Sequence, residues 1–170
     1  MILVSEDNIR AFTEKGYWGE KTVIDLLYAE AAVSSDKEAL VDPYNKKDLV
    51  GTDPKRLTYG EFIQSIDRLA VKFLDMGVQP DNVIIVQLPN IMELTLTIFA
   101  AARVGAIVSP IPVQWRAHEI KHAVQLTDAV LCVTSHSFMG FDHVELFRTN
   151  LPADTSVRQY ITVGSGNAEG

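Results

Sequence analysis

Cysteine is almost absent from this chain, which has one among 170 residues, Cys132. A single cysteine cannot form an internal disulfide. Cys132 lies in the apolar run of residues 129–133, which predicts a buried thiol and not a nucleophile. Because 47% of the residues are hydrophobic, the chain can build a core without disulfides or structural metal.

Basic charge is also scarce. The chain has 15 Lys and Arg against 22 Asp and Glu, a formal net charge of −7. Proteins that bind nucleic acid owe most of their affinity to contacts between basic side chains and phosphates. The charge balance therefore excludes nucleic acid as an expected partner.

Long apolar runs are missing, and the first residues do not predict a leader. Residues 1–4 are apolar, but Glu6 and Asp7 follow at once, with no basic segment before them, so we expect no secretory signal and a cytoplasmic protein. The longest mostly apolar stretch, residues 91–108, is interrupted by Glu93, Arg103 and Gly105. It falls short of a membrane span.

The familiar nucleotide-binding and hydrolase motifs are absent as well. There is no G-x-x-x-x-G-K-[ST] loop, and Gly164-Ser165-Gly166 is followed by no lysine. The apolar segment 83–88 leads into Pro89-Asn90 in place of G-x-G-x-x-G. No serine stands in a G-x-S-x-G elbow. These motifs therefore assign no catalytic or cofactor-binding residue.

The first third of the chain predicts short elements. Residues 5–15 form a polar helix ended by Gly16, and Thr22 with Asp25 forms a capping box that opens a second helix. A short strand is expected at 38–42. Residues 43–56 are rich in turn-forming and basic residues, so we expect an exposed loop and the most flexible internal segment.

The central part alternates apolar strands with amphipathic helices. Strands are expected at 83–88, 106–108, 129–134 and 159–163, and helices at 59–74, 91–104, 115–126 and 142–148. Gly77 and Gly105 should end two of these helices, and Asn90 with Glu93 should cap the start of the second. The alternation predicts an α/β fold, a mostly parallel sheet with helices on both faces. We expect residues 1–56 to form an N-terminal region, 57–163 the α/β subdomain, and 164–170 a flexible tail or truncated linker.

One local motif suggests a metal. His118, Glu119 and His122 form H-E-x-x-H, in which two imidazoles one helical turn apart can bind zinc and the glutamate can act as general base. A catalytic zinc needs a third protein ligand, and the nearby candidates, His136, His143 and Glu145, lie in no third-ligand motif. We therefore favour an ordinary amphipathic helix with both histidines in solvent and assign no metal ligand. A zinc hydrolase is the least favoured function.

From Arg56 onward, ordered motifs resemble one family. The chain is similar to the N-terminal portion of the adenylate-forming (AMP-binding) acyl-CoA and aryl-acid synthetases, over about residues 17–134. The upstream segment from Gly16-Tyr17-Trp18 through Leu26-Leu27 is similar to the start of aryl and small acyl members. Five later segments carry the resemblance: Leu57-Thr58-Tyr59-Gly60-Glu61-Phe62, Gly77-Val78-Gln79-Pro80-Asp81, Gln87-Leu88-Pro89-Asn90, residues 101–110 (A-A-R-V-G-A-I-V-S-P), and residues 116–122. The last is similar to the family's R-x-x-E-I-x-H stretch, which explains the zinc-like pentapeptide without a metal.

The resemblance implies the fold of the first subdomain of the ligase N-terminal domain, truncated. It implies a parent enzyme that joins a carboxylic acid to ATP with Mg²⁺ as an acyl-adenylate and then makes a thioester with coenzyme A. In the family, the phosphate loop, the adenine-binding and acid-binding segments and the catalytic lysine come after the part that this chain resembles. We therefore expect an N-terminal scaffold fragment that is inactive alone, with no catalytic, cofactor-binding or metal-binding residue.

The expected partners are the rest of the ligase domain and further copies of the fragment, which should self-associate through exposed apolar surface. A free-standing α/β binding or assembly module is the alternative function. A reading frame that continues into a phosphate loop would distinguish the two. The residues leave open which acid is used and whether the thiol belongs to coenzyme A or to a carrier protein.

Overall fold

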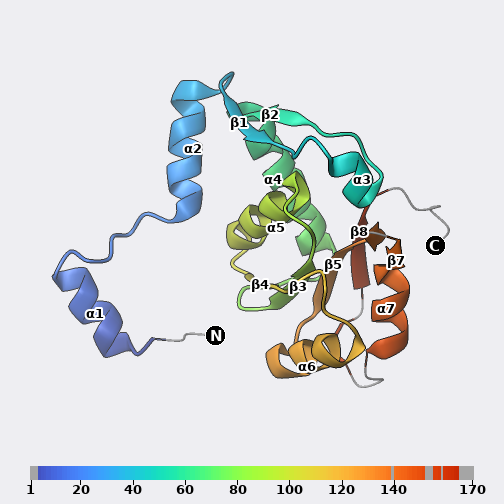
Figure 1. Cartoon of the computed structure of the whole chain (residues 1–170). Helices are drawn as coiled ribbons and strands as arrows, with labels where there is room; N and C mark the ends of the chain where they lie inside the picture. Colours follow the sequence, from blue (N-terminus) through green and yellow to red (C-terminus); the bar gives the residue numbers. More distant parts are fainter. Residues whose placement is uncertain (1–3, 139, 152–154, 158, 165–170) are drawn as a thin grey trace.

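A four-stranded parallel sheet forms the centre of the molecule (Figure 1). The computed structural model describes residues 4–138, 140–151, 155–157 and 159–164. The strand order is β4-β3-β5-β8, and all three pairings are parallel. The strands are β3 (Val83–Gln87), β4 (Ile107–Pro110), β5 (Leu131–Ser135) and β8 (Gln159–Val163). The predicted parallel sheet is therefore confirmed.

Helices cover both faces of this sheet, as predicted. One face packs against α4 (Tyr59–Asp75) and α5 (Met92–Arg103), and the other against α6 (Ala117–Thr127) and α7 (His143–Asn150). Every residue of β3 and β5 is buried, because these two central strands are covered on both sides. Cys132 in β5 is fully buried, and burial raises the pKa of its thiol to about 12, which confirms the predicted inert cysteine.

Local contacts and glycines set the ends of three helices, and of these features only the capping box at Thr58 was not predicted. The side chains of Thr22 and Asp25 form the capping box of α2 (Val23–Ser34), and Thr58 with Glu61 forms a second box at the start of α4. Gly77 and Gly105 have φ angles of +80° and +75°. Glycine has no Cβ, so it enters this left-handed conformation at low cost and ends each helix there.

The predicted cap of α5 is wrong. Ile91 is the N-cap residue and makes no side-chain capping bond. The N–H of Met92 instead donates to Oδ1 of Asp42, at 2.8 Å. A carboxylate 50 positions earlier in the chain thus accepts the capping hydrogen bond that was expected to go to Asn90. It can do so because the fold brings the end of β1 (Glu38–Val41) to the first turn of α5.

The segment expected as an exposed, flexible loop contains the short helix α3 (Lys46–Val50). Its two end residues, Lys46 and Val50, are buried, so the expectation is wrong at this point. The prediction failed because Lys46 is held by the carboxylates of Asp42 and Glu93. After α3 the chain forms β2 (Arg56–Thr58), which pairs antiparallel with β1 across the predicted boundary at residues 56 and 57.

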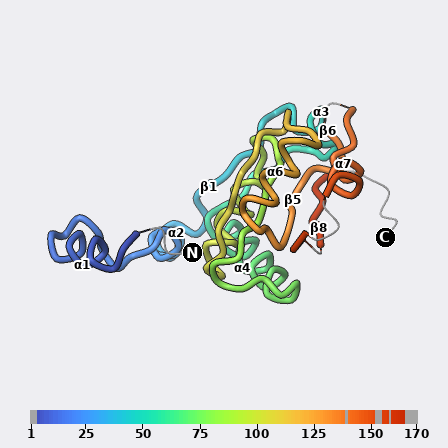
Figure 2. Tube along the Cα trace, turned by 90° about the horizontal axis from the view of Figure 1, so that it is seen from below, coloured from blue at the N-terminus to red at the C-terminus, as the bar shows by residue number. Residues whose placement is uncertain are grey.

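The remaining elements lie at the edges of the molecule. A two-stranded ribbon of β6 (Ser137–Phe138) and β7 (Phe141–Asp142) leads into α7. Helix α1 (Glu6–Glu14) stands apart from the sheet in two perpendicular views (Figures 1 and 2). In the described part of the chain, no helix combines the length and apolarity that a membrane span requires. The predicted tail lies outside the described residues except for Gly164.

Candidate functional site

The candidate site lies at the carboxyl ends of β3 and β5. From β3 the chain crosses to β4 on one side and then to β5 on the other, so the strand order reverses between β3 and β5. Open α/β sheets bind ligands outside the carboxyl ends of their strands at such a reversal. The polar residues at these two strand ends are Gln87, Thr134 and Ser135, all of them buried.

The side-chain amide of Gln87 is held from three directions. Its Nε2 donates to the carbonyl oxygens of Pro112, at 2.9 Å, and Trp115, at 3.1 Å. Its Oε1 lies 2.9 Å from Nδ1 of His143. An amide oxygen can only accept a hydrogen bond, so the proton of this pair sits on Nδ1 of His143. Nε2 of the same imidazole therefore carries the lone pair.

His143 is fully buried at the first position of α7. Burial, and to a lesser extent the positive charge of Arg116, lowers the pKa of the imidazole below its ordinary value, so the ring is neutral at pH 7. Within the described residues, Nε2 of His143 and Oγ of Ser135 have no hydrogen-bond partner. Both atoms are closed to solvent. The geometry therefore anchors α7 and the β6-β7 ribbon to the sheet without offering an open reactive group.

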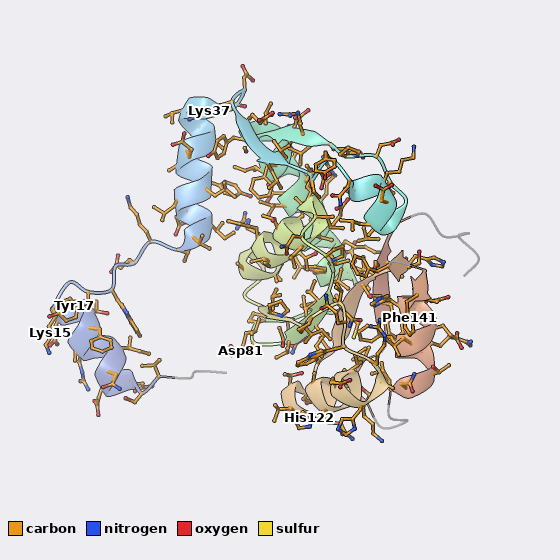
Figure 3. The ribbon with its side chains drawn as sticks, viewed as in Figure 1. Lys15, Tyr17, Lys37, Asp81, His122 and Phe141 are labelled. Carbon is orange, nitrogen blue, oxygen red and sulfur yellow. The ribbon has the colours of Figure 1, made fainter. Side chains whose placement is uncertain are left out.

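An aromatic rim surrounds this buried pair. The ring centroids of Phe138 and Phe141 lie 6.3 and 5.6 Å from that of His143, both edge-on. The guanidinium of Arg116 lies 4.0 Å from the centroid of Phe141, a cation–π contact, and its Nη1 donates to the carbonyls of Val113 and Trp115. Figure 3 shows Phe141 beside α7, on the side of the sheet opposite α2. The guanidinium of Arg116, the cation of this rim, is thus already held by Phe141 and by two backbone carbonyls.

A second polar cluster joins α3 to α5. Nζ of Lys46 lies 2.8 Å from Oδ2 of Asp42 and 2.6 Å from Oε1 of Glu93. The side chains of Lys46 and Asp42 are 1% and 0% exposed, whereas that of Glu93 is 30% exposed. Oε2 of Glu93 is buried and has no hydrogen-bond partner among the described residues. The three charges form one network that fixes α3 against the start of α5.

Burial and hydrogen bonding oppose each other in this network. Burial alone raises the pKa of Asp42, but hydrogen bonds from Lys46 and from the N–H groups of Met92 and Lys55 outweigh it and lower the pKa. Burial likewise lowers the pKa of Lys46, and the bonds to Asp42 and Glu93 reverse this and raise it. Both groups are therefore charged at neutral pH, and the network is a salt bridge and not a proton-sharing pair.

The zinc-like motif lies on α6 with its polar residues in solvent. His118, Glu119 and His122 are exposed, and Figure 3 shows His122 pointing away from the sheet. The inward residues are Ile120, Ala123 and Val124, as predicted. In the residues that the structure describes, no three His, Cys, Asp or Glu side chains are grouped to hold a metal, so His136, His143 and Glu145 do not complete the motif. Glu145 instead pairs with Arg148.

The sequence placed Gln87 in a family motif but predicted no structural role for Gln87 or Lys46. A glutamine at the end of an otherwise apolar strand is a usable signal, because a buried amide needs hydrogen-bond partners. Lys46 gave no signal, since a lysine among turn residues is ordinarily exposed.

Comparisons with known proteins agree with this fold. The family described as AMP-binding enzyme matches residues 27–169. Triostin synthetase I of Streptomyces triostinicus is 33% identical over 138 residues, which are 81% of this chain and 24% of that protein. A 2-hydroxy-7-methoxy-5-methyl-1-naphthoate–CoA ligase of Streptomyces carzinostaticus is 27% identical over 160 residues, 94% of this chain and 27% of that protein.

Among solved structures, apo MbtA of Mycobacterium smegmatis superposes with a TM-score of 0.76 and 25% identity, covering 95% of this chain and 28% of that one. The fold is that of the N-terminal domain of an adenylate-forming ligase. The chain belongs to the AMP-binding enzyme family. It spans about a quarter of the length of the relatives that it matches.

Proposed function

We propose that this chain is the N-terminal scaffold of an ATP-dependent carboxylate–CoA ligase. In the parent reaction a carboxylate oxygen attacks the α-phosphorus of ATP and pyrophosphate leaves. The thiol sulfur of coenzyme A then attacks the carbonyl carbon of the acyl-adenylate and AMP leaves. Membership of the family supports the adenylating step, and the naphthoate–CoA ligase of S. carzinostaticus supports an aromatic acid and coenzyme A.

The observation that carries the scaffold role is that Gln87, Lys46 and Arg116, near the reversal of strand order, are each already held by other residues, and that the unbonded Nε2 of His143 and Oγ of Ser135 are closed to solvent. Gln87 holds His143, Lys46 is held by two carboxylates, and Arg116 lies on Phe141. Transfer of a nucleotidyl group needs oriented donors or cations that face the phosphates. The described residues do not fit MgATP, so no step of the reaction is assigned to them.

The test compares the 170-residue chain with the complete ligase that contains it. We expect the chain alone neither to hydrolyse ATP nor to exchange pyrophosphate with it. The complete ligase should exchange pyrophosphate when the right acid is present and form a thioester when coenzyme A is added. Aryl and small acyl acids are tried first because Gly16-Tyr17-Trp18 is similar to the start of such family members.

Three results would contradict the proposal. One is acid-dependent exchange by the 170-residue chain alone. Another is a complete protein that is inactive with a broad panel of acids. The third is a stop codon directly after Gly170, which would favour a free-standing binding module. The expected partner is the rest of the same ligase domain, and the expected location is the cytoplasm.

A further inference from the structure

The N-terminal arm, defined here as residues 5–22, makes little contact with the rest of the described chain. It consists of α1 and the segment that leads to α2. Helix α1 has no buried residue, and it stands clear of the sheet in both views (Figures 1 and 2). A nine-residue helix is marginal in water without tertiary contacts, so the arm needs a surface to pack on.

The arm presents an aromatic cluster of Phe12, Tyr17 and Trp18. The N–H groups of Tyr17 and Trp18 both donate to the carbonyl oxygen of Phe12, at 2.9 and 3.2 Å. The rings of Tyr17 and Trp18 lie 6.2 and 5.2 Å from that of Phe12. The three residues are still 36%, 72% and 41% exposed. The backbone therefore fixes a compact aromatic group whose outer side is uncovered.

Aromatic side chains in this arrangement suit a docking contact. Tyr and Trp are enriched among the residues that dominate interface energies, because they bury a large area at little cost in conformational entropy. Helix α2, which follows the arm, exposes further apolar side chains at Val23, Leu26 and Val33. An exposed apolar surface of this kind marks an interaction site.

The solved structure that this chain matches over most of its length is itself much longer than the chain. The family match begins at residue 27, after the arm. The match to apo MbtA nevertheless covers 95% of this chain, which leaves out about nine of its 170 residues, so much of the 18-residue arm is matched. That structure is more than three times as long as the matched part, since the match covers 28% of it. Much of the arm is therefore included in the match to a protein that is far longer than this chain.

We propose that the aromatic cluster docks the N-terminal arm onto an apolar surface in the remaining part of the ligase. This inference rests on the proposed function, because it requires that a ligase body accompany this chain. In this contact the side chains of the cluster are buried against the ligase body, and α1 packs on the same surface.

Limited digestion with trypsin tests the proposal. Lys15 and Lys21 flank Tyr17 and Trp18 and are exposed, and Figure 3 shows Lys15 beside Tyr17 at the end of α1. We expect cleavage at these two lysines to be at least about tenfold slower in the complete ligase than in the 170-residue chain. A Phe12→Ala/Trp18→Ala variant of the ligase should be cleaved at the fast rate. Glu14→Gln, on the same helix but outside the cluster, should stay protected.

Fluorescence provides a readout that does not depend on the cluster variant folding. In a Trp115→Phe background, Trp18 is the only tryptophan of the chain's two that remains. Its emission in the 170-residue chain should be that of a solvated indole. In the complete ligase, the emission of Trp18 should shift to shorter wavelength. A Trp18→Phe variant of the same ligase gives the emission of the other tryptophans, which is subtracted.

Equal cleavage rates and equal Trp18 emission in the two proteins would overturn the inference. A 170-residue dimer whose arm is already protected would also overturn it, because a second copy would then be the occupant. A protected arm in a ligase that shows no pyrophosphate exchange would overturn the proposed activity and leave the docking contact standing.

Discussion

Oε1 of Gln87 lies 2.9 Å from Nδ1 of His143, across 56 positions of sequence. The contact joins the end of the first strand of the sheet to the start of the last described helix. It also fixes the tautomer of a buried imidazole, because the amide nitrogen of Gln87 is already committed to two carbonyls. A neutral His143 is therefore part of the folded structure.

The stability of the chain should depend on the protonation of His143. Burial lowers the folded-state pKa of this imidazole, so the unfolded chain binds a proton at higher pH than the folded chain does. The stabilisation from neutral His143 is complete at pH values above the pKa of the unfolded chain's imidazole, about 6.5. It is lost as the pH falls through the lower pKa that His143 has in the folded chain. Urea unfolding across this range should show a falling free energy of unfolding for the wild type and a flatter profile for His143→Gln. His122→Gln, at an exposed position on α6, should keep the wild-type slope.

Lys46→Met should destabilise the fold strongly. The change leaves the carboxylates of Asp42 and Glu93 beside each other without their ammonium partner, and removal of one member of a buried ion pair costs about 3 kcal/mol or more. The neighbouring Lys47→Met is the control, since Lys47 makes an exposed salt bridge with Asp53 that is worth less than about 1 kcal/mol. Equal losses for the two variants in chemical denaturation would contradict the buried network.

Gly105→Val should abolish folding, in the fragment as in the parent. Gly105 has φ +75°, and a Cβ there would lie 3.3 Å from Cβ of Pro80, so the variant combines a left-handed backbone with a steric contact. Gly77 has a similar φ of +80°, but a Cβ there meets nothing within 4 Å. Gly77→Val should therefore give a folded protein with a reduced melting temperature. Soluble yield and melting temperature of the Gly105→Val and Gly77→Val variants separate the effect of the steric contact from that of the left-handed backbone.

The H-E-x-x-H segment should bind no stoichiometric zinc. His118 and His122 are exposed on α6, and the described residues supply no third ligand near them. Metal analysis of the purified chain should find less than one zinc per chain, and His118→Ala should leave the activity of the complete ligase nearly unchanged. Retention of one zinc that His122→Ala releases would support a metal site instead.

The 170-residue chain should self-associate at the β8 edge. Within the described residues β8 pairs only with β5, and beside it lies an apolar groove of about 110 Å³. The groove is lined by Leu69, Glu93, Leu96, Thr97, Val133, Ile161 and Val163. Sedimentation should show concentration-dependent association that Thr162→Lys reduces, because lysine on an edge strand opposes strand pairing. Thr149→Lys on α7 adds the same charge away from this edge. A strictly monomeric wild type without hydrophobic dye binding would count against exposed apolar surface.

Much of the fold could be predicted from local patterns. The apolar, β-branched run at 83–88 predicted a strand covered on both faces, and β3 is buried at every position. The boxes at Thr22 and Thr58 are contacts within a single helical turn, so four consecutive residues contain all the information they need. Family motifs then identified the AMP-binding enzyme family, because their order along the chain is itself a sequence property.

Local sequence was enough to predict the features whose stabilising contacts lie within a few residues: capping boxes, glycine helix ends and the alternation of strands with helices. The roles of Asp42, Lys46, Gln87 and His143 depend on contacts that form only in the folded chain. Their partners lie up to 56 positions away, and a buried charge or amide is stable only where the fold supplies those partners. Residue type and spacing do not specify such distant contacts, which is why a helix tied into the core was expected as an exposed loop.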